Sequence, residues 1–252
     1  MLLGIFGLLL FWDIQLKAMA AVSLRYARRH LNRIVANMAR QLLALVRVYG
    51  GLKLDLDRRL ITSVPSPTLV CANHQSIADI VVLMAALSSH NLRFVAKKEL
   101  TRGFPAVSEV LRIQRHALIA RGGAFRHATR ELRRLGRETA IGNSPVIFPE
   151  GTRSRDGVVR TFHPGGIRTI LAEARVPITA VAIDGGHNFA SVKDLLGGLG
   201  RFTYRAKLVG VFEHDGDKAT IQRAVDSAQS AIALQVARWQ AAEGESVATG
   251  GA

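Results

Sequence analysis

From about Lys53 onward, short apolar runs alternate with longer segments of helical periodicity, and this alternation constrains the fold most strongly. The apolar runs have the length of buried strands, whereas the longer segments repeat their apolar residues as amphipathic helices do. Because strands that alternate with helices pair mainly in parallel, the sequence predicts an α/β fold with a largely parallel central sheet flanked by helices. We expect strands at Thr68–Ala72, Leu92–Ala96, Ala117–Ala120, Pro145–Phe148, Ile178–Ile183 and Tyr204–Phe212, and helices near Ile80–Leu87, Pro105–Leu111, Ala124–Arg137 and Gly165–Ala174.

The N-terminal segment Met1–Trp12 is uncharged and strongly apolar. A membrane-spanning helix needs about 20 such residues, but Asp13 and Lys17 follow directly, and a charge near the centre of a spanning helix costs roughly 2.5–3.5 kcal/mol. The sequence therefore disfavours a full crossing. A secretory signal is also disfavoured, because no basic segment precedes the apolar run.

The stretch Ser23–Val48 contains no glycine or proline and predicts a basic amphipathic helix. Its arginines and its apolar residues fall on opposite sides of the helix: Arg25, Arg28, Arg29, Arg33, Arg40 and Arg47 against Leu31, Ile34, Val35, Met38, Leu42 and Leu45. Such a helix either lies in a membrane interface or packs on a globular domain. The apolar segment before it favours the membrane.

These patterns predict three regions. Residues 1–50 form a hydrophobic and amphipathic helical membrane anchor, which Gly50 and Gly51 end. Residues 51–242 form the α/β domain and end with a helix that runs from Lys218 to about Ala242. Residues 243–252 are small and polar, which is typical of a flexible tail.

The chain is strongly basic, with 34 Lys and Arg against 19 Asp and Glu and a formal net charge of +15. A positive field attracts nucleic acid, an anionic membrane surface or phosphorylated substrates. The low aromatic content of 6% and the apolar N-terminus argue against nucleic acid. Cys71 is the single cysteine and lies in an apolar run, so we expect a buried thiol. The histidines show no metal-ligand spacing, and we expect no metal site.

His74 and Asp79 follow directly after the expected strand Thr68–Ala72. Functional sites of open α/β sheets gather at the carboxyl ends of strands. If His74 precedes a helix and Asp79 lies in its first turn, the carboxylate can accept one imidazole N–H and fix the tautomer. The other ring nitrogen then remains free to take a proton. Ser76 is a plausible N-cap of that helix.

A second polar cluster, from Glu150 to Ser154, follows the strand Pro145–Phe148. Gly151 permits a tight turn with close backbone approach. Arg153 offers a planar fork that suits a phosphate group. Glu150 either orients Arg153 or contacts a substrate hydroxyl.

The two clusters together resemble the glycerolipid acyltransferase family, whose best-known members are 1-acylglycerol-3-phosphate acyltransferases. Four sequence blocks match in order: Asn73-His74 with Asp79, Ile119-Ala120-Arg121, Phe148–Ser154 and Val176-Pro177-Ile178-Thr179. The resemblance covers roughly Lys53 to Ile183, and the first and third blocks are the specific ones.

This resemblance implies roles for the matching residues. His74 is the general base and Asp79 orients it. The substrate-binding residues implied by the family are Arg121, Glu150, Gly151, Thr152, Arg153 and Pro177, with Pro177 shaping the pocket.

The resemblance also implies an activity. A fatty acyl group would pass from acyl-CoA or acyl carrier protein to the hydroxyl of 1-acyl-sn-glycerol-3-phosphate, with no cofactor besides the donor. Both thioester donors are cytosolic, which places the protein on the cytoplasmic face of the cell membrane.

One departure leaves the acceptor open. The family often has Lys-Gly after Phe162, where this chain has His163 and Pro164. Another lyso-lipid, such as a lyso-ornithine lipid, is therefore an alternative acceptor. A non-catalytic membrane lipid-binding protein is the alternative from a different class.

Overall fold

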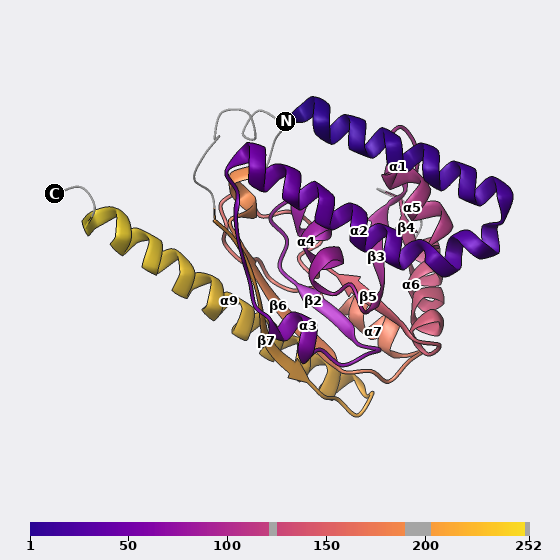
Figure 1. Ribbon diagram of the computed structural model, residues 1–252. Coiled ribbons are helices and arrows are strands. Elements are labelled where there is room, and N and C mark those ends of the chain that lie inside the picture. Colours follow the sequence, from indigo (N-terminus) through magenta and orange to yellow (C-terminus); the bar gives the residue numbers. More distant parts are fainter. Residues whose placement is uncertain (121–124, 190–202, 250–252) are drawn as a thin grey trace.

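The computed structural model describes residues 1–120, 125–189 and 203–249. Residues 121–124, which include Arg121, and the stretches 190–202 and 250–252 lie outside the described residues. For 188–189 and 244–249 only the backbone is described. The described chain forms one sheet with helices on both faces (Figure 1).

The sheet has seven strands in the order β1-β7-β6-β2-β5-β3-β4. Every neighbouring pair is parallel except β6 and β7, which are antiparallel. The strands are β1 (Lys53–Leu56), β2 (Leu69–Ala72), β3 (Asn91–Lys97), β4 (Ala117–Ile119), β5 (Asn143–Ile147), β6 (Ile178–Asp184) and β7 (Thr203–Phe212). The predicted α/β class and largely parallel sheet are confirmed.

Alternate residues of the central strands enter two separate cores. Val70 and Ala72 of β2 face a core that includes α4, whereas Leu69 and Cys71 face a core formed with α6, α7 and α9. A strand covered on both faces reads as a continuous apolar run, which is why β2 and β6 were recognisable in the sequence. The helices in these layers are α4 (Ala78–Ala86), α6 (Phe125–Thr139), α7 (Gly165–Leu171) and α9 (Lys218–Thr249).

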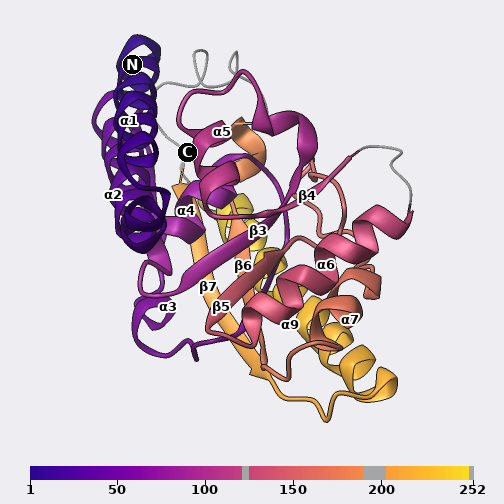
Figure 2. The ribbon, with the colours of Figure 1, turned by 90° about the vertical axis from the view of Figure 1, so that its right-hand side faces the viewer.

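Two long helices, α1 (Leu2–Val22) and α2 (Leu24–Gly50), lie antiparallel beside one another on the α4 side of the sheet (Figures 1 and 2). Ser23 separates them, and its side chain accepts a hydrogen bond from the backbone N–H of Tyr26, capping α2. The short helix α5 (Val107–Ile113) packs against both. The hairpin is thus joined to the α/β domain.

The apolar face of α2 is buried, with Leu31, Val35 and Met38 in a core shared with α1 and α5. The expectation that this face enters a membrane is therefore wrong, since protein already covers it. The exposed apolar side chains belong to α1 instead: Leu3, Phe6, Leu10, Phe11 and Ile14.

The apolar segment before Asp13 belongs to a continuous helix, α1, which extends past Asp13 and Lys17. By length and composition this helix could cross a membrane. Asp13 is compatible with this because it is buried against the protein, where it accepts hydrogen bonds from the backbone of Ala106 and from Lys17. Its charge does not interrupt the exposed apolar side.

Several short elements were not predicted, namely β1, α3 (Arg59–Thr62) and the 3₁₀ helices Lys98–Thr101 and Gly186–Phe189. Each has four residues, too few to show a periodic pattern. The last helix, α9, continues to Thr249 rather than ending near Ala242, so most of the expected tail is helical. The helix continues without a break through Gly244.

Candidate active site

The two polar clusters meet at one edge of the sheet. β2 and β5 are parallel neighbours, with Cys71 aligned to Ile147, so the segments after them start side by side. Asn73 fixes the first segment by extending the sheet: its side chain donates to the carbonyl of Ile183 and accepts from the N–H of the same residue, both at 2.8 Å. His74 is thereby held directly beyond the end of β2.

His74 and Asp79 form the expected pair. The Nδ1 atom of His74 lies 2.7 Å from Oδ2 of Asp79, whose side chain is fully buried. The histidine precedes α4 and the aspartate lies in its first turn, the arrangement that the spacing required. In the part of the chain that the structure describes, Nε2 makes no hydrogen bond, and 18% of the His74 side chain is exposed. One nitrogen is held while the other is available to a substrate.

The Asp79 carboxylate also accepts hydrogen bonds from the backbone of the loop. Its Oδ2 accepts the N–H groups of Gln75 at 2.7 Å and Ser76 at 2.9 Å. Asp79 therefore shapes the turn that presents His74, in addition to contacting the ring. The predicted N-cap, Ser76, contributes locally by accepting the N–H of Ala78 at 3.2 Å, but α4 begins one residue later than a Ser76 cap would place it.

Tyr204 of β7 completes the site from a distant part of the chain. Its fully buried hydroxyl donates to Oδ1 of Asp79 at 2.5 Å. Burial, reinforced by the Asp79 carboxylate, raises the pKa of Tyr204 well above its ordinary value, so the phenol retains its proton and acts as a donor. Asp79 is held on one side by the loop and on the other by this phenol.

Replacing Tyr204 with phenylalanine is expected to lower kcat by about tenfold and stability by about 1–2 kcal/mol, since a buried charged acceptor loses one donor. KM for the acceptor should change little, because Tyr204 does not reach solvent. Steady-state kinetics with a parallel thermal melt measure both effects. A variant with wild-type kcat would show that the loop alone positions Asp79.

Glu150 connects the two clusters through the backbone. Its Oε1 accepts the N–H of His74 at 2.8 Å and its Oε2 accepts the N–H of Arg160 at 3.0 Å. Burial raises the pKa of the Glu150 carboxyl, partly offset by these two N–H donors. The carbonyl of His74 in turn accepts the N–H of Ser154 at 2.7 Å. Glu150 therefore holds the His74 loop against its own loop.

This arrangement bears on one of the two roles expected for Glu150, the orientation of Arg153. The structure records no hydrogen bond or ion pair between Glu150 and Arg153, both of which are described. The side chain of Glu150 is only 5% exposed, and its contact with a substrate hydroxyl stays a prediction. Its two oxygens act on the backbone instead.

Ser154 of the second cluster is buried and donates a hydrogen bond to Asp156, whereas two other side chains of this cluster face outward. Thr152 and Arg153 are exposed beside the His74 loop, and Gly151 turns the chain with a φ of 70°, a conformation that favours glycine. The ring of Phe148 stacks on the ring of His74 with centroids 4.1 Å apart and an interplanar angle of 15°. This stacking fixes the imidazole plane, and the sequence did not indicate it.

Pro177 is not brought to this site. It lies just before β6, and its carbonyl accepts the N–H of Leu69 at the amino end of β2. His74 follows the other end of β2, about 15 Å away at roughly 3.3 Å per residue. The structure places Pro177 at the opposite end of β2 from His74, and its role in shaping the pocket stays a prediction. Arg121 lies outside the described residues, and His163 is exposed.

Sequence reasoning also missed Gln75. Its buried side chain accepts the N–H of Gly186 at 2.9 Å and donates to Asp184 at 3.2 Å, tying the His74 loop to the end of β6. A glutamine or tyrosine inside an otherwise apolar or buried segment needs a polar partner. Burial, which makes that requirement apply, could not be read from the sequence, where Gln75 lies in a polar run and Tyr204 stands between Thr203 and Arg205.

Cys71 is not a candidate nucleophile. Its thiol is fully buried in β2, and burial raises its pKa far above the ordinary value. Among the described residues, no three His, Cys, Asp or Glu side chains gather in a way that could hold a metal ion. The reactive group that the described site offers is the Nε2 atom of His74.

An open α/β sheet with a carboxylate-oriented histidine at a strand end defines a class of protein that can carry out base-assisted group transfer. The family model described as Acyltransferase matches residues 58–184, half of the chain. The chain therefore belongs to the acyltransferase family, and the matched range contains both polar clusters.

Individual relatives agree with this family. The chain is 35% identical to a lyso-ornithine lipid O-acyltransferase of Rhizobium meliloti over 131 residues, which are 52% of this chain and 38% of the relative. It is 31% identical to a 1-acyl-sn-glycerol-3-phosphate acyltransferase of Cocos nucifera over 116 residues, which are 46% of this chain and 36% of the relative. The chain thus matches little more than a third of the length of these two relatives.

A solved structure shows the same fold. The 1-acyl-sn-glycerophosphate acyltransferase PlsC of Thermotoga maritima aligns with a TM-score of 0.65 and 18% sequence identity, covering 92% of this chain and 96% of the other. The similarity extends beyond residues 58–184 and includes most of the N-terminal hairpin.

Proposed function

We propose that this protein transfers a fatty acyl group from a thioester to the free hydroxyl of a lyso-lipid, with His74 as the general base. The observation that carries the proposal is the His74 ring, held at Nδ1 by a buried carboxylate and unbonded at Nε2 within the described chain. A group held in this way can accept a proton from a substrate hydroxyl.

The proposed reaction balances without an acyl-enzyme. Nε2 of His74 takes the hydroxyl proton as the oxygen attacks the thioester carbonyl, and a carbon–oxygen bond forms. The tetrahedral intermediate then expels the thiolate, which takes the proton back from the imidazolium. Asp79 stabilises the imidazolium between these steps, because its carboxylate lies 2.7 Å from Nδ1.

The acceptor in this proposal is 1-acyl-sn-glycerol-3-phosphate, which would yield phosphatidic acid. Arg153 is exposed beside the His74 loop, and a guanidinium suits a phosphate monoester. A lyso-ornithine lipid is the second candidate. It is favoured by the relative of that name in Rhizobium meliloti and by the absence of a Lys-Gly pair after Phe162.

Arg153 is the residue that we expect to bind the phosphate group of the first acceptor. Replacing Arg153 with alanine should raise KM for 1-acyl-sn-glycerol-3-phosphate by about 10- to 100-fold, which is the loss of one hydrogen bond between charged groups. Arg153→Lys should recover part of the affinity, because it keeps the charge but not the planar fork. Equal KM values for the wild type and both variants would remove Arg153 from phosphate binding.

The function itself is tested by product analysis. Purified full-length protein in phospholipid vesicles is given an acyl thioester and either lysophosphatidate or a lyso-ornithine lipid, and the acylated product is identified by mass spectrometry. We expect phosphatidic acid from the first acceptor. Product from the lyso-ornithine lipid alone would reassign the acceptor, and no product from either would favour a non-catalytic lipid-binding protein.

We further propose that α1 holds the protein on the membrane. Its exposed side is apolar, and the exposed fractions of Leu3 (89%) and Ile14 (59%) are unusual for side chains in contact with water. The donors, acyl-CoA or acyl carrier protein, are cytosolic, which places the α/β domain on the cytoplasmic face of the membrane. Selective loss of vesicle binding after polar substitution of Phe6 and Phe11 would support this placement.

A further inference from the structure

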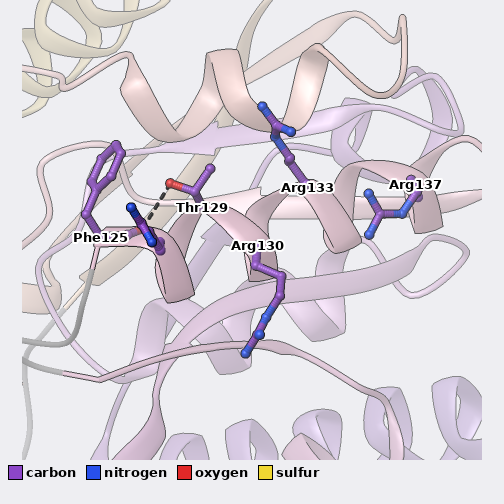
Figure 3. A pocket seen from close by; sticks show the side chains of 6 residues that line it. Phe125, Thr129, Arg130, Arg133 and Arg137 are labelled. Atoms are coloured by element: carbon purple, nitrogen blue, oxygen red, sulfur yellow. Dashed lines mark hydrogen bonds between the residues drawn. The ribbon is translucent and has the colours of Figure 1, made fainter.

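The outer face of α6 carries four arginines that the proposed reaction does not use. Arg126, Arg130, Arg133 and Arg137 fall within about 60° of one another at 100° per residue, whereas buried Leu135 lies on the other side of the helix. Together with Phe125 and Thr129 they line an open depression of about 350 Å³. Figure 3 shows the labelled members extending from successive turns of α6.

These arginines keep most of their charge unpaired. The two glutamates of α6, Glu131 and Glu138, both bind Arg134, at 2.9 and 2.8 Å. Only Glu173 borders the face, at 4.0 Å from Arg133 and 3.5 Å from Arg137 in the described chain. Exposed ion pairs of this length contribute little. Among the described residues, the four arginines therefore face a single carboxylate.

A membrane in contact with α1 would not reach the arginine face of α6. The sheet separates α6 from the α1–α2 hairpin, which lies on its other side (Figures 1 and 2). Each helix layer is about 10–12 Å across. A bilayer in contact with α1 would therefore lie well beyond the Debye length of about 8 Å at physiological ionic strength. The arginines on α6 need a different anion.

The arrangement of the charges suits an acidic protein better than a nucleotide. From Arg126 to Arg137 the row spans about 16 Å at 1.5 Å per residue. A compact diphosphate would engage side chains that converge on one point, whereas a row of this length matches carboxylates along a helix. Phe125, 84% exposed at one end of the row, adds the kind of aromatic anchor found at protein interfaces.

The strand that precedes the arginine row ends at the same edge of the sheet as the active site. β4, which precedes α6, runs parallel to β3, so its carboxyl end lies at the same edge of the sheet as His74. Three strand spacings of about 4.8 Å separate β4 from β2, roughly 14 Å. A protein docked along α6 could therefore deliver a tethered thioester to His74.

We propose that the arginine face of α6 is the docking surface for the acyl donor, and that this donor is an acyl carrier protein, an acidic helical protein that carries its acyl chain as a thioester on a flexible arm. This inference rests on the proposed acyltransferase function. Of the two candidate donors it selects the protein-bound one, and it assigns that protein to the arginine face of α6.

The test compares two variants that make the same change in net charge. Arg130→Glu with Arg133→Glu reverses the docking face, and Arg223→Glu with Arg238→Glu is the control on exposed positions of α9. Both are assayed with acyl carrier protein and with CoA carrying the same acyl chain. Binding of fluorescent acyl carrier protein is measured separately by anisotropy, independently of turnover.

We expect the α6 variant to raise KM and Kd for acyl carrier protein by about tenfold or more, with the acyl-CoA reaction and vesicle binding within about twofold of wild type. The control should behave as wild type. Equal losses with both donors, an equal loss in the control, reduced vesicle binding, or no wild-type binding of acyl carrier protein would each overturn the docking proposal. Wild-type binding without turnover of any donor would instead contradict the acyltransferase function.

Discussion

Replacing His74 with alanine is expected to lower kcat for acyl transfer by about 10²–10⁴-fold, the usual contribution of a general base. The acceptor hydroxyl would have to lose its proton to water, because Nε2 of His74 is the ring nitrogen left available in the described site. KM for both substrates should change much less. Steady-state rates of thiol release, measured with wild type and variant in identical vesicles, give the comparison.

Folding must be controlled in this experiment, because the backbone of His74 also holds the loop. Its N–H and carbonyl bind Glu150 and Ser154 and remain in the alanine variant. The variant should therefore melt near the wild-type temperature and bind vesicles equally well. A folded variant with wild-type kcat would remove His74 as the base.

Replacing Asp79 with asparagine should cause a loss that approaches that of the His74 variant, again about 10²–10⁴-fold in kcat. The amide oxygen can still accept hydrogen bonds from Nδ1 of His74 and from the N–H groups of Gln75 and Ser76, so the loop can form. The negative charge that stabilises the imidazolium is gone. The amide NH₂ also faces the Tyr204 hydroxyl, which must then accept rather than donate.

The two residues act as one unit, which a double variant tests. His74→Ala combined with Asp79→Asn should be about as slow as His74→Ala alone, because Asp79 has no ring left to assist. A double variant slower by the product of the two single losses would show that Asp79 acts independently of His74. The control is Asp226→Asn, an exposed carboxylate of α9 whose side chain binds Gln222 rather than any residue of the His74 loop.

The sequence predicted the central part of the fold and of the site, for identifiable reasons. The central strands are covered on both faces, so their apolar runs were unambiguous. His74 and Asp79 are five residues apart, and local geometry at a helix start decides whether they meet. The second cluster was visible as a polar run at a strand end, and the parallel pairing of β2 and β5 brings it beside the first.

What the sequence did not reveal depends on long-range contacts. Tyr204 reaches Asp79 from 125 positions away, and Phe148 stacks on His74 only because β2 and β5 are neighbours. Glu150 belongs to a family motif, yet the motif does not show that its side chain binds the backbone of His74 and Arg160. The apolar face of α2 looked suited to lipid because nothing in its own sequence showed that α1 and α5 cover it.

The claim that His74 removes the proton of the acceptor, rather than forming a covalent intermediate, is tested most directly by rapid-mixing measurement of thiol release. Enzyme and acyl thioester are mixed with and without lyso-lipid. A base mechanism predicts release only when the acceptor is present, with no initial burst. A burst of free thiol equal to the enzyme concentration in the absence of acceptor would contradict it.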